Sequence, residues 1–233
     1  MNILKLSDVN SYYGKSHILF NVSLTVRKGE VTALLGRNGV GKTTTLRTIM
    51  NLVTKRTGEI IFKENVDLMR VPTHKIAKLG ISYVPDHGGI FPNLTVEENL
   101  KISVKQGVGK GLFDMKTIFE LFPQLKDFVN RAAGTLSGGE RRMLGIAKGL
   151  LLNPELLLID EPSEGLAPRI IRDIIETIKR IQKHGVSVLL TSPNLLFVEK
   201  TADRIYVMDK GEIKLSGKVD ELSREEVERI LTF

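Results

Sequence analysis

The sequence contains no cysteine among its 233 residues. This absence excludes disulfides, thiolate metal sites and a cysteine nucleophile, but it leaves the redox compartment open. Long hydrophobic runs are also missing: the runs at 156–159 and 188–190 fall far below the roughly 18 residues of a membrane-spanning helix. Charge appears too early in residues 1–8 for a secretory signal core, and we expect a cytoplasmic protein.

Charge is only mildly biased toward the basic side. The chain has 34 lysines and arginines against 27 acidic residues, which gives a net charge of +7. Such a bias suits nucleic acid, an anionic membrane surface or simple solubility. Because the lysines are spread along the chain without a basic block, a solvated surface is favoured and charge alone does not choose a partner.

Strand-like segments alternate with helical ones, which predicts an α/β fold with a mainly parallel sheet. Helices are expected at 43–53 and 168–183, the second with isoleucines at helical spacing that form core rather than a binding surface. Strands are expected at 31–35, 59–62, 81–84, 156–159, 186–191, 205–208 and 212–215.

From residue 91 to about residue 152 the strand signals disappear. Thr95 and Glu98 form a predicted capping box, and Ser137 is placed to cap a helix that runs to Leu152. We therefore expect one domain over residues 1–233. Its core lobe comprises about 1–90 and 153–233, and an inserted helical lobe covers about 91–152.

A glycine-rich segment fits the phosphate-loop pattern G-x-x-x-x-G-K-[ST] and lies between a predicted strand and a predicted helix. The backbone N–H groups of such a loop face one anion, Lys42 reaches the β- and γ-phosphates, and Thr43 ligates Mg²⁺. The alternative is a glycine-rich turn without a ligand. The nucleotide-binding residues predicted here are Gly36, Arg37, Asn38, Gly39, Val40, Gly41, Lys42, Thr43 and Thr44.

Two carboxylates follow the apolar run at 156–159. Asp160 and Glu161 stand at the carboxyl end of a predicted strand, where ligands of open α/β sheets bind. Because neighbouring residues face opposite sides, we assign Asp160 to Mg²⁺ and Glu161 to polarising the attacking water. An ordinary pair of charges at a strand end is the alternative.

The segment Leu136, Ser137, Gly138, Gly139 and Glu140 resembles the signature of ATP-binding-cassette (ABC) ATPases, between the phosphate loop and the acidic strand. The resemblance implies a P-loop NTPase core with an N-terminal antiparallel β portion, and ATP and Mg²⁺ as cofactors. It further implies that Tyr13, before Gly14, stacks on adenine, with a surface aromatic residue as the alternative. Ser137, Gly138 and Gly139 would cap ATP bound to a second ATPase subunit, so catalysis should need a dimer.

Finer details are similar to the ATPase subunits of branched-chain amino acid importers, of the LivF type. They lie at residues 83–86, 90–100 and 165–168. This resemblance implies ATP-driven import of branched-chain or other hydrophobic amino acids. The implied partners are a second ABC ATPase subunit, identical or different, transmembrane permease subunits and indirectly an extracytoplasmic substrate-binding protein, with the chain peripheral on the inner face of the membrane.

The sequence departs from the family at two positions. Asp86 stands where most cassettes have a glutamine near Mg²⁺, and it is either a metal ligand or a loop or permease contact. Pro193 stands where many have a histidine that holds the γ-phosphate, and proline offers no donor. Ser192 or Asn194 could supply a weaker hydrogen bond. We predict hydrolysis that is slow or dependent on a partner subunit.

Two alternatives to a transport ATPase stay open. One is an ATP-gated cassette with weak or no hydrolysis of its own, paired with a second cassette. The other is a soluble ABC ATPase that acts on nucleic acid or ribosomes. The single cassette and the ordinary spacing of 95 positions from Lys42 to Ser137 disfavour this last reading, and no nucleic-acid partner is expected.

Overall fold

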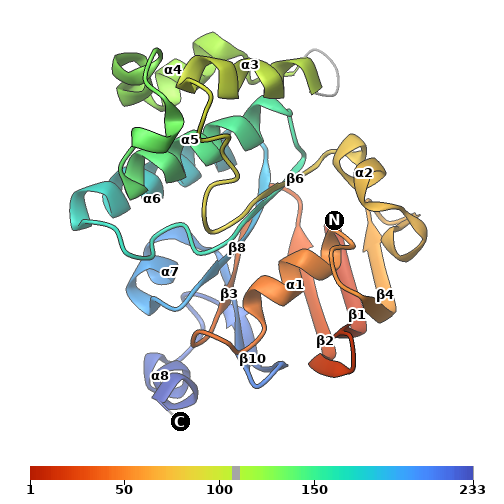
Figure 1. The fold of residues 1–233 in the computed structure, drawn as a ribbon. Coiled ribbons are helices and arrows are strands. Elements are labelled where there is room, and N and C mark those ends of the chain that lie inside the picture. Colours follow the sequence, from red (N-terminus) through yellow and green to blue (C-terminus); the bar gives the residue numbers. More distant parts are fainter. Residues whose placement is uncertain (107–110, 233) are drawn as a thin grey trace.

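The computed structural model describes residues 1–106 and 111–232, and its centre is a six-stranded sheet (Figure 1). All neighbouring strands are parallel except β9 and β10, which confirms the expected α/β fold. Strands β3, β7 and β8 are buried throughout, as their continuous apolar sequences require. The strand order is β10 (Glu212–Lys218), β9 (Arg204–Asp209), β3 (Val31–Leu35), β8 (Ser187–Ser192), β7 (Leu156–Ile159) and β6 (Ile81–Val84).

A second, antiparallel sheet is built mainly from the N-terminal part of the chain. Its order is β2 (Ser16–Arg27), β1 (Asn2–Tyr13), β4 (Lys55–Phe62) and β5 (Val66–Asp67). The strand expected at 59–62 is thus the end of a longer strand. Strand β1 buries one face, and its alternation is interrupted at Asp8, which has a φ of 49° beside a register shift.

Helix α1 follows β3 directly but ends earlier than the sequence pattern predicts. The predicted helix at 43–53 extends too far, because Asn51 adopts a φ of 56° and turns the chain toward β4. The α-helices are α1 (Lys42–Ile49), α2 (Thr73–Ile76), α3 (Val96–Gln106), α4 (Met115–Leu121), α5 (Gly138–Leu151), α6 (Pro168–Lys183), α7 (Leu195–Thr201) and α8 (Arg224–Thr232).

Helices α3, α4 and α5 gather at one end of the molecule (Figure 1). Both expected caps are present: Glu98 accepts from the Thr95 N–H at 2.8 Å, and Ser137 and Glu140 form a capping box at the start of α5. Short 3₁₀ segments complete the connections, at Leu68–Arg70, Ala77–Leu79, Pro123–Phe128 and Ala133–Thr135. The division into a core lobe and a helical lobe stays a prediction.

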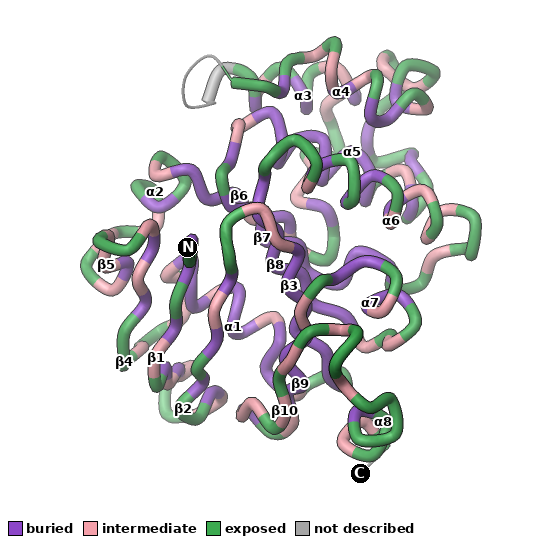
Figure 2. The backbone as a smooth tube through the Cα atoms, turned by 180° about the vertical axis from the view of Figure 1, so that it is seen from behind, coloured by how far each residue is buried: buried purple, intermediate pink, exposed green. Residues whose placement is uncertain are grey.

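The hydrophobic core forms two clusters, and the strands at the centre of the molecule are buried (Figure 2). In α6, Ile174, Ile178 and Ile181 are buried and the remaining isoleucines of the stripe pack against the same cluster, so the stripe is core as expected. Over residues 1–106 and 111–232, no helix has both the length and the apolar character to cross a membrane.

Candidate nucleotide site

The glycine-rich loop joins β3 to α1, and its backbone requires glycine at particular positions. A Cβ at Gly36 would come within 2.5 Å of the Met208 carbonyl oxygen. Gly39 and Gly41 have φ values of 86° and 112°, which strain other residues. The loop therefore wraps tightly at the N-terminus of α1, where backbone N–H groups and the helix dipole favour an anion. These observations explain why the pattern requires glycine.

Lys42 lies inside this loop, with 3% of its surface exposed. Its Nζ donates to the Arg37 carbonyl at 2.9 Å and lies 3.0 Å from a Glu161 carboxylate oxygen. A weaker contact of 3.4 Å reaches the Asn38 side chain. The structure thus brings Lys42 and Glu161, which are far apart in the sequence, into one ion pair.

Asp160 is fully buried and accepts hydrogen bonds from three hydroxyls. Thr43 donates at 3.1 Å and Thr191 at 2.6 Å to one carboxylate oxygen, while Tyr83 donates at 3.3 Å to the other. The nearby carboxylate and burial both raise the pKa of Tyr83, burial being the larger effect. Asp160 and Thr43 therefore face each other, as a shared Mg²⁺ site requires.

Glu161 occupies a backbone conformation that is unusual for a residue with a side chain. Its φ is 46°, and its N–H donates to the Thr191 hydroxyl at 2.9 Å. Burial raises the pKa of the Glu161 carboxyl, and the adjacent carboxylate of Glu164 raises it further, while Lys42 acts in the opposite direction. Glu164 in turn accepts from the Asn38 amide at 3.0 Å, so the acidic loop and the phosphate loop are joined by two contacts.

Tyr13 ends β1 on the face that also carries the buried Ser11, which is hydrogen-bonded to Thr48 of α1. The Tyr13 hydroxyl is buried beside the Arg47 guanidinium, and this proximity raises the pKa of Arg47. The ring of the neighbouring Tyr12, by contrast, is stacked on His17 at 4.2 Å. Tyr13 therefore lies beside α1, and adenine stacking on it stays a prediction.

Asp86 follows β6, and its carboxylate is hydrogen-bonded to the next residue, His87. The carboxylate accepts from the His87 N–H at 2.8 Å, and this side chain is 60% exposed. Hydrogen bonding from His87 lowers the pKa of Asp86. Within the described residues, no hydrogen bond joins this carboxylate to Thr43 or Asp160. Both roles predicted for Asp86 therefore stay open.

The signature residues form the N-terminus of α5, apart from the phosphate loop. Ser137 and Gly138 are exposed, whereas Gly139 is packed against Ile170, only 2.9 Å from where a Cβ would lie. In the part of the chain that the structure describes, no hydrogen bond or ion pair links these residues to residues 36–44. The phosphate loop and the signature residues are thus two separate helix N-termini, each of a kind that favours an anion.

Pro193 follows β8 and is half-buried. Its neighbours are committed to local structure: the Ser192 hydroxyl accepts from the Asn194 N–H at 3.0 Å, and the Asn194 side chain caps α7 by accepting from Phe197 N–H at 3.1 Å. These contacts use the side-chain oxygens as acceptors, so a weaker hydrogen bond from Ser192 or Asn194 to the γ-phosphate stays a prediction.

The sequence interpretation missed several residues of this site: Tyr83, Arg142, Glu164 and Thr191. Glu164 lies in a motif that was recognised, but only the hydrogen bond to Asn38 shows what its side chain does. Thr191 ends a predicted strand, so a polar residue at that sheet edge was a usable signal. Arg142 and Tyr83 gave no such signal, because an arginine in a helix or a tyrosine in a strand is usually expected at the surface when only the sequence is known.

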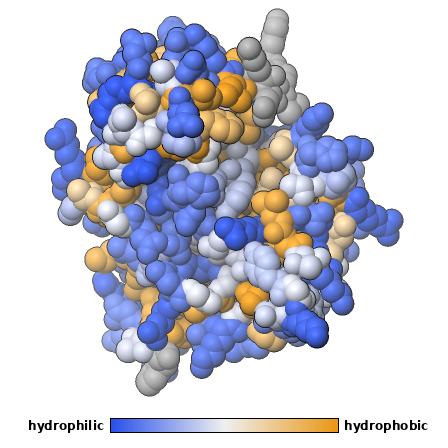
Figure 3. Space-filling view, in the orientation of Figure 1, coloured by the Kyte–Doolittle hydropathy of each residue, from blue (hydrophilic) through white to orange (hydrophobic). Residues whose placement is uncertain are grey.

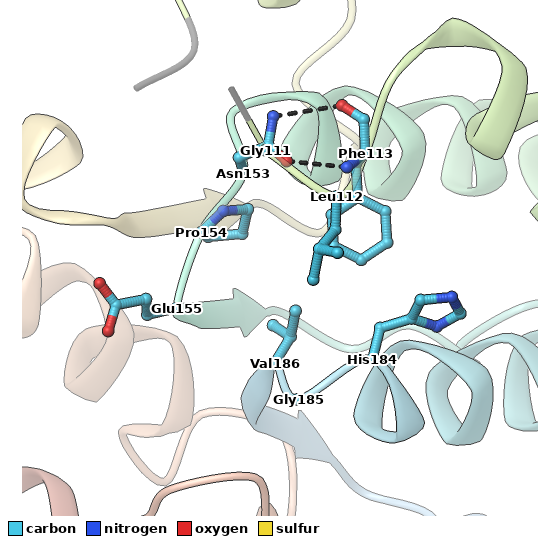
Figure 4. Close-up of a pocket in the computed structure, with 9 residues that line it drawn as sticks. All are labelled: Gly111, Leu112, Phe113, Asn153, Pro154, Glu155, His184, Gly185 and Val186. Carbon is cyan, nitrogen blue, oxygen red and sulfur yellow. Dashed lines mark hydrogen bonds between the residues drawn. The ribbon is translucent and has the colours of Figure 1, made fainter. Parts of the chain in front are cut away.

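A pocket of about 350 Å³ lies at the opposite end of the sheet (Figure 4). It is lined by Asn153 and Glu155, which precede β7, and by His184 and Val186, which precede β8. The Asn153 amide holds the backbone of Phe113 through two hydrogen bonds. Since the phosphate loop and Asp160 follow the carboxyl ends of their strands, this pocket is no part of the nucleotide site.

The donor groups at the candidate metal position suit Mg²⁺. Thr43 and Asp160 offer a hydroxyl and a carboxylate, the hard oxygen ligands that this ion prefers. No group of three or more His, Cys, Asp or Glu side chains able to hold a metal occurs in the described ranges. Mg²⁺ is commonly bound by one or two protein oxygens together with phosphate oxygens, so Thr43 and Asp160 would hold it jointly with a nucleotide.

Comparisons with known proteins bear on the same residues. A family model described as ABC transporter matches residues 19–164. A Pseudomonas aeruginosa protein named high-affinity branched-chain amino acid transport ATP-binding protein BraG is 41% identical, with 91% of each chain covered. A protein of Archaeoglobus fulgidus named probable branched-chain amino acid transport ATP-binding protein LivF is 35% identical over 96% of this chain and 95% of its own length. A solved structure of a nucleotide-free ATP-binding cassette from an ABC transporter superposes with a TM-score of 0.83 and 27% identity, covering 100% of this chain and 96% of that one.

Proposed function

Because the chain belongs to the ABC transporter family and is one of its ATPase subunits, we propose that it powers import of branched-chain or other hydrophobic amino acids. The observation that carries the site assignment is the junction of the phosphate loop with the acidic strand end. Lys42 lies 3.0 Å from Glu161, and Thr43 lies 3.1 Å from Asp160. Residues for phosphate, metal and water thus meet in one place.

We assign the steps of hydrolysis to these residues. The loop N–H groups of residues 36–44 and Lys42 hold the phosphates, and Thr43 and Asp160 hold Mg²⁺. The metal ion, when bound, neutralises charge that develops on the transferred phosphoryl group. Phosphates draw Lys42 away from Glu161, which then orients the attacking water and accepts its proton. The raised pKa of Glu161 suits that role, because a stronger base takes the proton more readily.

The partners follow from the second anion site. Ser137, Gly138 and Gly139 cap ATP bound to a second ATPase subunit, and ATP then holds two subunits together. The permease subunits provide the path across the membrane and a substrate-binding protein delivers the amino acid, with this chain on the inner face. Exposed hydrophobic side chains support a partner surface at the end of the molecule that holds α3. Phe91 precedes this helix and Val104 lies on it. Hydrophobic residues are visible among polar ones at the top of Figure 3.

Pro193 favours one second candidate, an ATP-gated cassette that hydrolyses slowly and relies on a different ATPase subunit. Proline has no side-chain donor for the γ-phosphate, and the side-chain oxygens of Ser192 and Asn194 accept hydrogen bonds from the local backbone. The two candidates differ in turnover and not in nucleotide binding.

Phosphate release from ATP tests the proposal, measured with purified protein alone and with its permease partners. Glu161→Gln should abolish release and retain ATP binding, while Glu225→Gln, an exposed change on α8, should leave both unchanged. Wild type that stays inert with its partners but binds ATP supports the second candidate. Wild type that binds no nucleotide contradicts both.

A further inference from the structure

Arg142 is a buried arginine that the proposed chemistry does not use. It lies in the second turn of α5, three residues after Gly139, and only 8% of its surface is exposed. One guanidinium nitrogen donates to the backbone carbonyl of Asp86 and, at 3.3 Å, to that of Asp160. A single side chain therefore ties the signature helix to the segments that follow β6 and β7.

The surroundings of Arg142 are acidic. Burial lowers its pKa, and four carboxylates oppose that effect by raising it. The carboxylates are those of Asp86, Asp160, Glu164 and Glu161. A pocket of about 170 Å³ beside the guanidinium is lined by Asp86, Gly138 and Glu164 among others, so these segments meet around Arg142. Lys42 is the other buried cation of the site, and ATP would add further negative charge.

We propose that Arg142 is a positioning residue for ATP hydrolysis, whose charge offsets the carboxylates of Asp86 and Glu164 while its hydrogen bonds hold α5 against the ends of β6 and β7. This inference rests on the proposed function. The Arg142 charge would compensate for the negative charge of Asp86, which stands near the proposed ATP site where the family usually has a neutral glutamine. Arg142 acts through the acids and touches neither substrate nor metal.

A double-mutant cycle tests the charge role, because Asp86→Asn removes the carboxylate charge but keeps the carbonyl that Arg142 binds. Arg142→Gln should lower kcat about tenfold with little change in KM, and Arg142→Lys should retain most activity. The double variant should recover about threefold over Arg142→Gln alone. Arg229→Gln, which removes an exposed charge on α8, serves as the matched control.

A second readout does not require turnover. Binding of a fluorescent ATP analogue, kept at a fixed concentration, is measured while Mg²⁺ is titrated. The Mg²⁺ concentration for half-maximal binding should fall about threefold in Arg142→Gln, because a more negative site attracts the cation. Adding Asp86→Asn should reverse this change. Unchanged kcat and Mg²⁺ requirement in Arg142→Gln overturn the inference. The inference is also overturned if Arg142→Gln lowers kcat but Asp86→Asn does not restore it and Arg142→Lys is equally slow. That result would mean that the hydrogen bonds of Arg142, and not its charge, are important. If wild type releases no phosphate with its partners, the proposed function has failed, and the Mg²⁺ titration still decides the role of the Arg142 charge.

Discussion

Thr191→Val is the perturbation that most directly tests how the acidic strand end is held. The Thr191 hydroxyl is fully buried, donates to Asp160 at 2.6 Å and accepts from the Glu161 N–H at 2.9 Å. Valine has nearly the same shape but neither donates nor accepts. The substitution thus removes a hydroxyl that is hydrogen-bonded to the Asp160 carboxylate and to the Glu161 backbone, with almost no change in volume.

The expected loss can be worked out from these two bonds. The bond to an ionised carboxylate contributes about 2 kcal/mol, and leaving the Glu161 N–H buried without its acceptor costs about 2 kcal/mol. Burying the added methyl group returns about 1 kcal/mol. The free energy of unfolding should therefore fall by about 3 kcal/mol. Because Glu161 is held at a φ of 46° by this bond, kcat should fall by about tenfold or more.

Urea unfolding and phosphate release measure the two effects. Thr201→Val is the matched control, since Thr201 is equally buried but its hydroxyl only donates to the Phe197 carbonyl at 2.6 Å within α7. Its cost should stay below about 1 kcal/mol, with kcat unchanged. Equal costs for the two variants would refute the reasoning, and so would a Thr191→Val enzyme with normal turnover.

Three further predictions concern other parts of the chain. Pro193→His should raise the turnover of wild type severalfold if the missing donor limits hydrolysis, whereas unchanged phosphate release would show that it does not. Gly41→Ala should cost more unfolding free energy than Gly185→Ala in urea titrations, since both glycines have positive φ but only at Gly41 would the Cβ meet a neighbour, Leu19, at 2.8 Å. Burial lowers the pKa of Lys148 to about 8, so the folded protein releases this proton more readily than the unfolded chain, and stability should rise with pH. Between about pH 7 and about pH 9.5, wild type should gain about 2 kcal/mol relative to Lys148→Met in urea unfolding, and no gain would contradict the assignment.

The central strands and the phosphate loop could be predicted because their signals are local. Strands β3 and β7 are continuous apolar runs, and the loop after β3 needs glycine at positions where a Cβ would clash or φ is positive. These requirements are written in consecutive residues. The capping boxes at Thr95 and Ser137 were predictable for the same reason.

The remaining features depend on contacts between distant segments. The pattern at 43–53 continues as a helix, but the packing of β4 against β1 takes the chain away after Ile49. Thr191 acts on Asp160, about 30 positions earlier in the chain, and Arg142 binds Asp86, 56 positions earlier. No local sequence spacing encodes such contacts. The first two strands were expected only from the family resemblance. The alternation of β1 is broken by the irregular pairing near Asp8, whereas Val22, Leu24 and Val26 of β2 do alternate with more exposed residues and were a usable signal.

The pair of Lys42 and Glu161 gives a physical reason why hydrolysis should depend on bound ATP. Without phosphate, each group is the counter-ion of the other, which satisfies two buried charges that would otherwise be costly. Phosphates offer Lys42 a stronger partner, and Glu161 then loses its cation at the position where water must be activated. Since Lys42 lowers the pKa of Glu161, removing it strengthens the carboxylate as a base at that moment. In the proposed mechanism, the same contact thus stabilises the site before ATP binds and makes Glu161 more effective as a base once ATP is bound.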